Sequence, residues 1–390
     1  MFQFSTEELE QLGAEITTRE IKQQPDLWKE ALALYKDKQA QIDDFIGQIF
    51  NRHEQVKIIL TGAGTSAYVG DTLLPFLKQV TDARTHLFES VPTTDLVSNP
   101  YAFYQEDQPT LLISFARSGN SPESVAAVEL GQALVKDFYQ LTITCAPEGK
   151  LAQKAQGDPN NLVLLQPAGA NDQGFAMTGS YSCMLLTCAL VFDPSLIAEK
   201  EAWVQTACQL GQSVIEREAD LQALLEGDIQ RVIYLGSGPF AGLARETQLK
   251  ILELTAGKIA TNFDSSMGFR HGPKSFVDGQ SLALVYVSNH PYTRQYDVDI
   301  INELAGDQIA KKVVAITVQG DKHFDKADSF DFDSQGQDLP DIYLALPYVM
   351  VGQTISLLAS IKVDNKPDTP SPSGTVNRVV KGVTIHQYQA

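Results

Sequence analysis

Glu246, Lys250 and Glu253 stand four and three residues apart, a spacing that places all three side chains on one face of a helix. The helix is expected to open after the glycine-bearing turn at residues 234–239, where a proline suits the first helical position, and to stop near Gly257. Two interpretations fit this face. It is either a solvated stripe of ion pairs or a set of groups that move protons.

A histidine that follows this helix favours the second interpretation. A polar, glycine-bearing loop at residues 264–268 leads to His271, which precedes a Gly-Pro pair. A carboxylate and an imidazole brought together are the groups that proton transfer needs. Asp264 has two possible roles in this loop, since it could orient His271 or simply cap the turn. A carboxylate of this helix face and His271 are therefore candidates for proton transfer.

The turn at residues 61–66 is suited to binding an anion. Gly62 and Gly64 let the backbone approach a ligand closely, and Thr65 and Ser66 offer hydroxyl groups where a helix begins. Two alternatives remain for this turn taken alone. It could be a tight turn that only needs glycine, or a loose match to the dinucleotide-binding pattern.

A second turn of the same kind favours a phosphate site over these two alternatives. Arg117, Ser118, Gly119 and Ser121 also follow an expected strand and open a helix, so hydroxyl groups and a cation lie at a second strand end. Two such turns suit one terminal phosphate better than a pyrophosphate. The chain has no GxxxxGK[ST] pattern, which argues against nucleotide hydrolysis.

Composition limits the kinds of partner. The net charge of −18 argues against nucleic acid or an anionic membrane, because both require a basic surface. The four cysteines have no metal-binding spacing and are expected to be buried thiols in a reducing compartment. The N-terminus lacks the pattern of a signal peptide, and no apolar run is expected to reach the length of a membrane span. A soluble, cytoplasmic protein is the expectation.

The order of elements predicts an α/β fold made of two similar halves. We expect an N-terminal helical segment over residues 1–50, a first domain over 51–205, a second over 206–370 and a tail over 371–390. Residues 231–238 repeat residues 57–64 in type and spacing, which indicates an internal duplication. Strands alternate with helices in both halves, a pattern typical of parallel sheets. The expected strands are 56–60, 86–89, 110–115, 138–144 and 162–165 in the first half, and 231–235, 282–287, 312–317 and 342–346 in the second.

Taken together and in this order, these motifs resemble the sugar isomerase (SIS) family. The resemblance covers about residues 50–390 and implies two tandem flavodoxin-like, doubly wound domains. Residues 17–28 and 174–178 look like the AgaS branch, whose members act on galactosamine 6-phosphate or tagatose 6-phosphate. Two positions depart from the family pattern, because Ala116 stands where a serine is common and Gly179 replaces a lysine.

The resemblance also implies roles for individual residues. It implies that Glu253 transfers the proton, that His271 opens the sugar ring, and that Lys250 supports the same site. Lys381, in the C-terminal tail, is implied to steady the open-chain oxygen or to form an imine. The implied phosphate contacts are Gly64, Thr65, Ser66, Arg117, Ser118, Gly119 and Ser121.

The expected activity is a deaminase/isomerase that converts galactosamine 6-phosphate into tagatose 6-phosphate and ammonia, with no metal or other cofactor. Alternatives are an aldose–ketose isomerase, a non-catalytic phosphosugar sensor and a dinucleotide oxidoreductase. The turn at residues 288–291 has lost the Ser-Gly pattern, so one sugar site per chain is expected. The family resemblance implies a homodimer with shared sites, in which His271 acts in its own or the neighbouring subunit's site.

Overall fold

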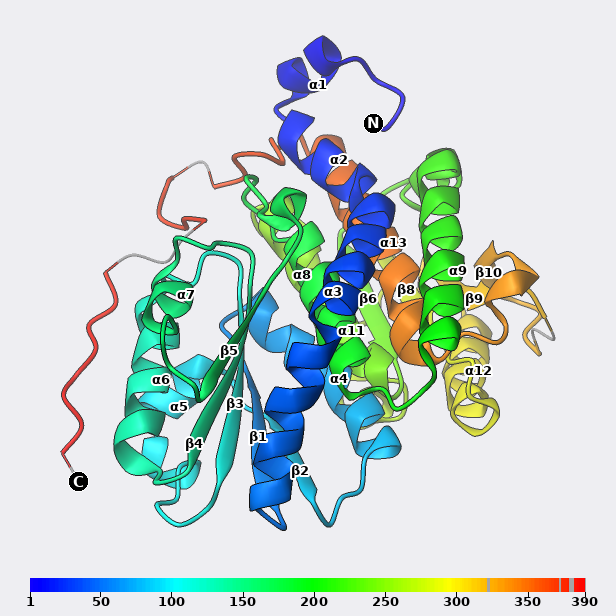
Figure 1. Cartoon of the computed structure of the whole chain (residues 1–390). Coiled ribbons are helices and arrows are strands. Elements are labelled where there is room, and N and C mark those ends of the chain that lie inside the picture. Colours follow the sequence, from blue (N-terminus) through cyan, green and yellow to red (C-terminus); the bar gives the residue numbers. More distant parts are fainter. Residues whose placement is uncertain (321–322, 372, 379–381, 390) are drawn as a thin grey trace. The chain divides into compact units, whose positions relative to one another are not determined.

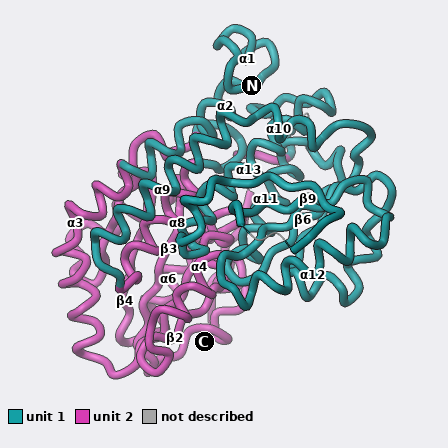
Figure 2. The backbone as a smooth tube through the Cα atoms, turned by 90° about the vertical axis from the view of Figure 1, so that its right-hand side faces the viewer, with its two compact units in different colours: residues 1–29, 173–178, 195–375 teal, residues 30–172, 179–194, 376–390 magenta. Residues whose placement is uncertain are grey.

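A computed structural model describes residues 1–320, 323–371, 373–378 and 382–389. The chain divides into two compact units, shown in different colours in Figure 2. Unit 1 contains residues 1–29, 173–178 and 195–375, and unit 2 contains residues 30–172, 179–194 and 376–390. Each unit is built around one five-stranded sheet in which every pairing is parallel. The α/β class and the tandem arrangement are therefore confirmed.

The sheet of unit 2 has the strand order β2-β1-β3-β4-β5. Thr72 of α4 and Tyr181 of α8 share a hydrogen bond of 2.8 Å between their hydroxyl groups. Helices α5 and α6 contribute residues to one buried apolar cluster. Most of α3 (Gln24–Arg52) also belongs to this unit. Figure 1 labels the α-helices and β-strands of this unit. The other elements are β1 (Val56–Thr61), α4 (Thr65–Val80), β2 (His86–Ser90), α5 (Thr93–Ser98), η1 (Pro100–Ala102), β3 (Thr110–Ala116), α6 (Pro122–Leu134), β4 (Phe138–Thr144), α7 (Lys150–Lys154), β5 (Asn161–Leu165), η2 (Ala168–Ala170) and α8 (Gly179–Phe192).

The sheet of unit 1 has the order β7-β6-β8-β9-β10, which repeats that of unit 2 strand for strand. The elements are α1 (Thr6–Leu12), α2 (Glu15–Lys22), α9 (Ile197–Glu216), α10 (Glu218–Leu224), β6 (Arg231–Gly236), α11 (Pro239–Leu254), β7 (Ala260–Ser265), η3 (Gly268–Arg270), η4 (Pro273–Phe276), β8 (Ser281–Tyr286), α12 (Pro291–Asp307), β9 (Lys312–Val318), β10 (Asp328–Phe332), η5 (Ser334–Gly336) and α13 (Asp341–Lys362). This second-first-third-fourth-fifth order is that of a flavodoxin-like sheet.

The duplication extends to the backbone of the first turn in each unit. Gly64 has φ 57° and ψ −129°, and Gly238 has φ 58° and ψ −129°, a left-handed conformation that favours glycine. Gly62 and Gly236 have the same packing restriction, because an added Cβ would lie 2.5 Å from Ser66 or 2.6 Å from Phe240. The repeat inferred from the sequence is confirmed residue by residue.

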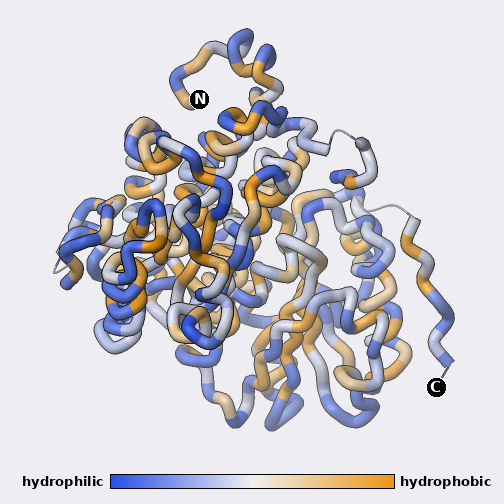
Figure 3. The backbone as a smooth tube through the Cα atoms, turned by 180° about the vertical axis from the view of Figure 1, so that it is seen from behind, coloured by the Kyte–Doolittle hydropathy of each residue, from blue (hydrophilic) through white to orange (hydrophobic). Residues whose placement is uncertain are grey.

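Helix α13 corrects two expectations. Residues 342–346 are the first turns of this helix and not a strand, since a fully buried apolar run has the same composition in either element. The expectation that no run could span a membrane is also wrong, because α13 is long and apolar enough by length and composition. However, 94% of its apolar window is buried inside the protein, so it is a core helix. Hydrophobic stretches also gather within the sheets in Figure 3.

The sequence reasoning missed two strands of unit 1, β7 and the last strand, β10. The residues of β10 alternate in the expected way, with Phe330 and Phe332 buried and the intervening positions more exposed. The polar loop expected at residues 264–268 is partly a strand as well, because Asp264 and Ser265 end β7. Strand β7 lies at the edge of its sheet, and an edge position tolerates polar residues.

Candidate active site

In unit 2, the two hydroxyl-rich turns lie next to each other. Strand β1 pairs with β3 so that Thr61 stands opposite Ser114, and both strands then end at the same edge of the sheet. Helix α4 follows β1, and α6 follows β3. Strand order reverses between these two strands, and such a switch point is where doubly wound sheets bind ligands. The structure therefore brings residues 62–66 and 117–121 to the same edge of the sheet.

The first turn places hydroxyl groups at the start of α4. Thr65 and Ser66 are the first two residues of this helix, and they are 4% and 5% exposed. Gly64 is the residue that caps the helix, without a side chain of its own to occupy the space. The helix dipole favours negative charge at this end. The turn therefore has the chemistry of a phosphate site.

The second turn adds a buried cation and two further hydroxyl groups. Arg117 is 6% exposed, and its Nη2 donates to the carbonyl of Arg378 at 2.8 Å. Ser118 Oγ accepts a hydrogen bond from the amide of Asn120 at 3.3 Å, and Gly119 has a φ of 64°. Ser121 precedes α6, and its hydroxyl lies 2.6 Å from that of Ser124. An arginine fork beside hydroxyl groups is well suited to phosphate oxygens.

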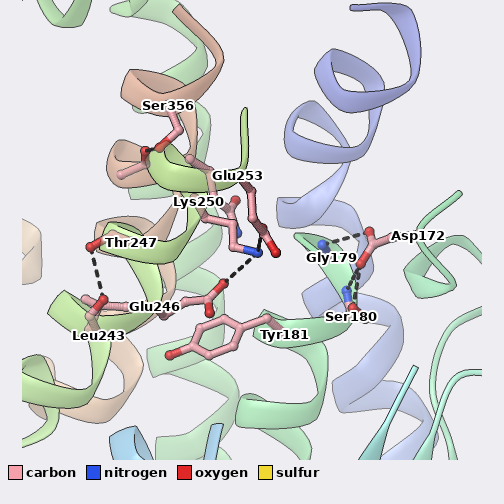
Figure 4. Close-up of polar contacts among 12 residues, drawn as sticks. Asp172, Gly179, Ser180, Tyr181, Leu243, Glu246, Thr247, Lys250, Glu253 and Ser356 are labelled. Atoms are coloured by element: carbon pink, nitrogen blue, oxygen red, sulfur yellow. Dashed lines mark hydrogen bonds and ion pairs between the residues drawn. The ribbon is translucent and has the colours of Figure 1, made fainter. Parts of the chain in front are cut away.

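A segment of the C-terminal tail contacts the second turn, because Arg378 is hydrogen-bonded to Arg117. Besides accepting from Arg117, Arg378 donates from its own guanidinium to the carbonyl of Asp172. Asp172 also caps α8, because its carboxylate accepts from the amides of Gly179 at 3.0 Å and Ser180 at 2.9 Å, as drawn in Figure 4. The sequence reasoning did not identify Arg378. Lys381, the predicted tail residue, lies outside the described residues.

In unit 1, α11 carries the predicted acid–base face. Figure 4 shows Lys250 between two carboxylates of the same helix. Its Nζ lies 2.6 Å from Glu253 Oε2 and 3.5 Å from Glu246 Oε1. The side chains of Lys250 and Glu246 are 1% and 0% exposed, whereas that of Glu253 is 24% exposed. The solvated-stripe interpretation is therefore wrong, and Glu253 is the member of the set that a ligand can reach.

His271 lies at the other end of the neighbouring strand. Helix α11 begins at the carboxyl edge of the sheet and ends near its amino edge, where β7 begins. The chain then passes along β7, and His271 follows at the carboxyl edge as the cap of η3. Glu253 and His271 of one chain are thus separated by about the length of this six-residue strand, roughly 20 Å. Asp264 accepts from the amide of Ser265 at 2.7 Å, the contact expected of a loop cap.

The equivalent edge of the unit 1 sheet carries a buried carboxylate. Asp297 of α12, which is 0% exposed, accepts hydrogen bonds from all three loops that follow β6, β7 and β8. The donors are Ser237 Oγ at 2.6 Å, Ser266 Oγ at 2.5 Å and the amide of Ser288 at 3.0 Å. By strand register, Ser288 occupies the position that Arg117 has in unit 2. A cation in one repeat is thus replaced by serine and a nearby carboxylate in the other, which opposes anion binding there.

The Asp297 carboxylate gives a prediction about pH and stability. Burial raises its pKa from 3.8 to about 6, against the effect of its hydrogen bonds, and Asp341 raises it further. The folded protein therefore binds this proton more tightly than the unfolded chain. The contribution is fully present below about pH 4 and is lost as pH rises through 6; the shift corresponds to roughly 3 kcal/mol.

We expect the stability of the wild type relative to Asp297→Asn to fall by up to roughly 3 kcal/mol between about pH 4 and pH 7. Urea denaturation across this range measures the difference, with Asp220→Asn at an exposed ion pair as the control. A wild-type-minus-variant difference that does not change with pH would contradict the prediction.

Within the described residues, no group of three or more His, Cys, Asp or Glu side chains is placed to hold a metal ion. The four cysteines are buried and unpaired with one another, as the sequence predicts.

Two doubly wound sheets of flavodoxin-like order, one with paired hydroxyl-rich turns, define a protein of the SIS-domain class, and the SIS domain model matches residues 52–193. The chain is 44% identical over 384 residues to the D-galactosamine-6-phosphate deaminase AgaS of Escherichia coli, with 96% of each chain covered. It is 40% identical to the protein of the same name from Shewanella sp. (strain ANA-3), covering 98% of this chain and 95% of that relative.

A solved structure agrees with these relatives. The crystal structure of tagatose-6-phosphate ketose/aldose isomerase from Escherichia coli matches with a TM-score of 0.87 and 40% identity, covering 96% of this chain and 97% of that one. The chain belongs to the AgaS family of SIS-domain proteins.

Proposed function

We propose that this protein converts galactosamine 6-phosphate into tagatose 6-phosphate and ammonia. The proposal is supported by near full-length similarity to relatives named D-galactosamine-6-phosphate deaminase. The structural observation that carries it is the buried Lys250, which holds Glu253 at 2.6 Å and leaves that carboxylate partly accessible. Such a group can take and return a proton.

The proposed reaction begins with binding of the phosphate by the turns of unit 2. Thr65 and Ser66 donate from one turn, and Arg117 supplies a guanidinium from the other. Gly64 and Gly119 let the backbone approach the phosphate, and Ser118 and Ser121 add hydroxyl groups. Because Arg117 is buried, its interaction with an anion is little screened by water.

The chemical steps are assigned to unit 1 and to the tail. His271 protonates the ring oxygen and opens the pyranose to the aldehyde. Glu253 removes the proton from C2, which gives an enolamine, and returns it to C1, which gives an imine at C2. Water adds to the imine, ammonia leaves, and the ketone of tagatose 6-phosphate remains. Lys250 positions Glu253, and Lys381 steadies the open-chain oxygen.

The name of the solved relative favours a second candidate reaction. With a hydroxyl group at C2, the same proton transfer passes through an enediol and interconverts an aldose and a ketose phosphate. Because the two reactions share Glu253 and differ only in the C2 substituent, the substrate decides between them.

A substrate panel tests the proposal. Purified protein is incubated separately with galactosamine 6-phosphate, glucosamine 6-phosphate, N-acetylgalactosamine 6-phosphate and tagatose 6-phosphate, and ammonia and ketose are assayed. We expect ammonia and ketose from galactosamine 6-phosphate alone. Conversion of tagatose 6-phosphate to an aldose without ammonia release from any amine would favour the isomerase. Tight binding without turnover of any sugar would favour a sensor.

The phosphate site gives a further prediction. Arg117→Ala is expected to raise the KM for the phosphosugar about 10- to 100-fold, because a charge-assisted hydrogen bond contributes roughly 1.5–3 kcal/mol to binding. Lys150→Ala, which removes an exposed cation of the same unit, is the control. Inhibition by inorganic phosphate should weaken by a similar factor. Unchanged KM and phosphate inhibition in Arg117→Ala would contradict the assignment.

We further propose a cytoplasmic homodimer in which His271 acts on the substrate held by the second copy. This proposal is supported by the separation of about 20 Å between Glu253 and His271 within one chain. An equal mixture of His271→Ala and Glu253→Gln chains, each with strongly reduced but measurable activity alone, should recover about one quarter of wild-type activity after the subunits exchange. Half of the dimers are then mixed, and each has one intact site of two. No recovery after confirmed exchange would contradict sharing.

A further inference from the structure

We propose that Glu303 of α12 is the positioning residue for His271, because it holds the chain on both sides of the imidazole. This inference rests on the proposed function of His271. None of the sequence motifs points to Glu303, which is 32 residues further along the chain. Contacts within unit 1 connect Glu303 to the loop that carries His271.

Two ion pairs join the His271 loop to Glu303. Arg270, which immediately precedes His271, lies with its Nε 2.6 Å from Glu303 Oε2. Lys274, three residues after His271, forms an ion pair with the other oxygen, Oε1. The two oxygens of a single carboxylate thus hold both ends of the segment that carries the imidazole.

Two further contacts strengthen this arrangement. Lys274 Nζ also lies 2.6 Å from Asp307 Oδ2, one helical turn beyond Glu303 on α12. Phe269 is 0% exposed, and it packs with Phe276 in an apolar cluster that includes Ile301 and Leu304 of α12. The loop is therefore fixed to one helix by apolar contacts as well as ion pairs.

The segment between these contacts needs such support. His271 is exposed, and its amide donates to the carbonyl of Gly268 at 2.9 Å. Gly272 has a φ of 121°, a region that side chains rarely adopt, and among the described residues no heavy atom beyond its chain neighbours lies within 4 Å of where a Cβ would stand. Local packing thus does little to fix this glycine, so the direction of the imidazole depends on the residues that flank it.

The ion pairs of Glu303 with Arg270 and Lys274 are better suited to positioning His271 than to stabilising the fold. Hydrogen bonds from Lys274 and Arg270 lower the pKa of Glu303, so the carboxylate stays ionised over the working pH range. The side chains of Arg270, Lys274 and Glu303 are 24%, 28% and 33% exposed. Ion pairs with this much solvent contact contribute little to the stability of a fold. They do fix geometry, and misplacement of a catalytic group by about 1 Å can lower a rate about 100-fold.

The test compares Glu303→Gln with wild type in the deamination of galactosamine 6-phosphate. We expect kcat to fall about 10- to 100-fold, KM to change by less than about threefold, and the melting temperature to stay close to that of the wild type. Glu15→Gln is the matched control, since it removes the carboxylate of another arginine pair in the same unit, at 2.7 Å. A wild-type kcat in Glu303→Gln would overturn the proposal.

A second comparison separates positioning from a structural effect. In a His271→Ala background, Glu303→Gln should cause no further loss of kcat, because the group that it positions is already absent. A loss by the same factor in both backgrounds would overturn the proposal.

Hydrogen exchange tests the inference independently of turnover. The backbone amides of residues 268–272 and of Lys274 should exchange faster in Glu303→Gln than in wild type, whereas Glu15→Gln should leave them unchanged. Unchanged exchange in Glu303→Gln would overturn the proposal. Faster exchange in a protein whose wild type releases no ammonia would instead show that the proposed function had failed while the Glu303 contacts hold the loop.

Discussion

Glu253→Gln is expected to lower kcat for galactosamine 6-phosphate by about 10²- to 10⁴-fold, the range that general acid–base groups contribute. The amide cannot accept the C2 proton, although it fills nearly the same volume. KM should change by only a few fold, because the proposed phosphate contacts belong to other residues. Steady-state assays of ammonia and ketose measure both constants.

The Glu253→Gln variant should keep the fold of the wild type. The amide oxygen of Gln can still accept from Lys250 Nζ, which lies 2.6 Å from Glu253 Oε2 in the wild type. Glu226→Gln, at an exposed position of the same unit, is the control. Incubation in deuterated water adds a stricter test, because the variant should also lose the incorporation of deuterium at C1. Substantial turnover or C1 labelling by Glu253→Gln would contradict the assigned role.

The tandem sheets could be predicted because their signals are local. Each strand that carries a binding turn is a short apolar run that ends in glycines, and the repeat of residues 57–64 at 231–238 revealed the duplication. Gly64 and Gly238 share one left-handed conformation that other residues rarely adopt. Because both turns require this backbone conformation, both halves have glycine at this position.

The prediction failed where composition alone cannot separate two elements. Residues 342–346 are apolar in a helix that is buried on all sides, so no polar face exists to reveal a helical period. Strand β10 contains three polar residues among five, and edge strands often have this composition. Strand β7, which was also missed, is a second edge strand with polar residues.

The candidate site, like the fold, contains residues that the sequence could predict and residues that it could not. The hydroxyl groups of Thr65 and Ser66 follow a recognisable turn, so their placement could be expected from spacing. Asp297 and Glu303 could not be found in this way, because their partners come from distant segments of the chain. Proximity in sequence was also misleading for His271, since β7 carries it away from Glu253.

Lys250→Met should cause a large loss of stability. The ammonium is 1% exposed, and it lies 3.5 Å from Glu246, whose side chain is 0% exposed. Removing one partner of a buried ion pair leaves the other charge in a medium of low polarity, which costs about 3–5 kcal/mol. Urea denaturation measures this loss, and Lys258→Met, which removes an exposed cation of the same unit, is the control.

A double variant identifies the cause of that loss. Glu246→Gln combined with Lys250→Met removes both buried charges, so its free energy of unfolding should exceed that of Lys250→Met alone. If the double variant is no more stable, the loss comes from packing around the lysine chain and not from an uncompensated carboxylate. The activity of the double variant should stay low in either case, because Glu253 no longer has the ammonium that holds it. Recovery of stability without recovery of turnover would therefore separate the two roles of Lys250, which neutralises Glu246 inside the fold and positions Glu253 for the substrate.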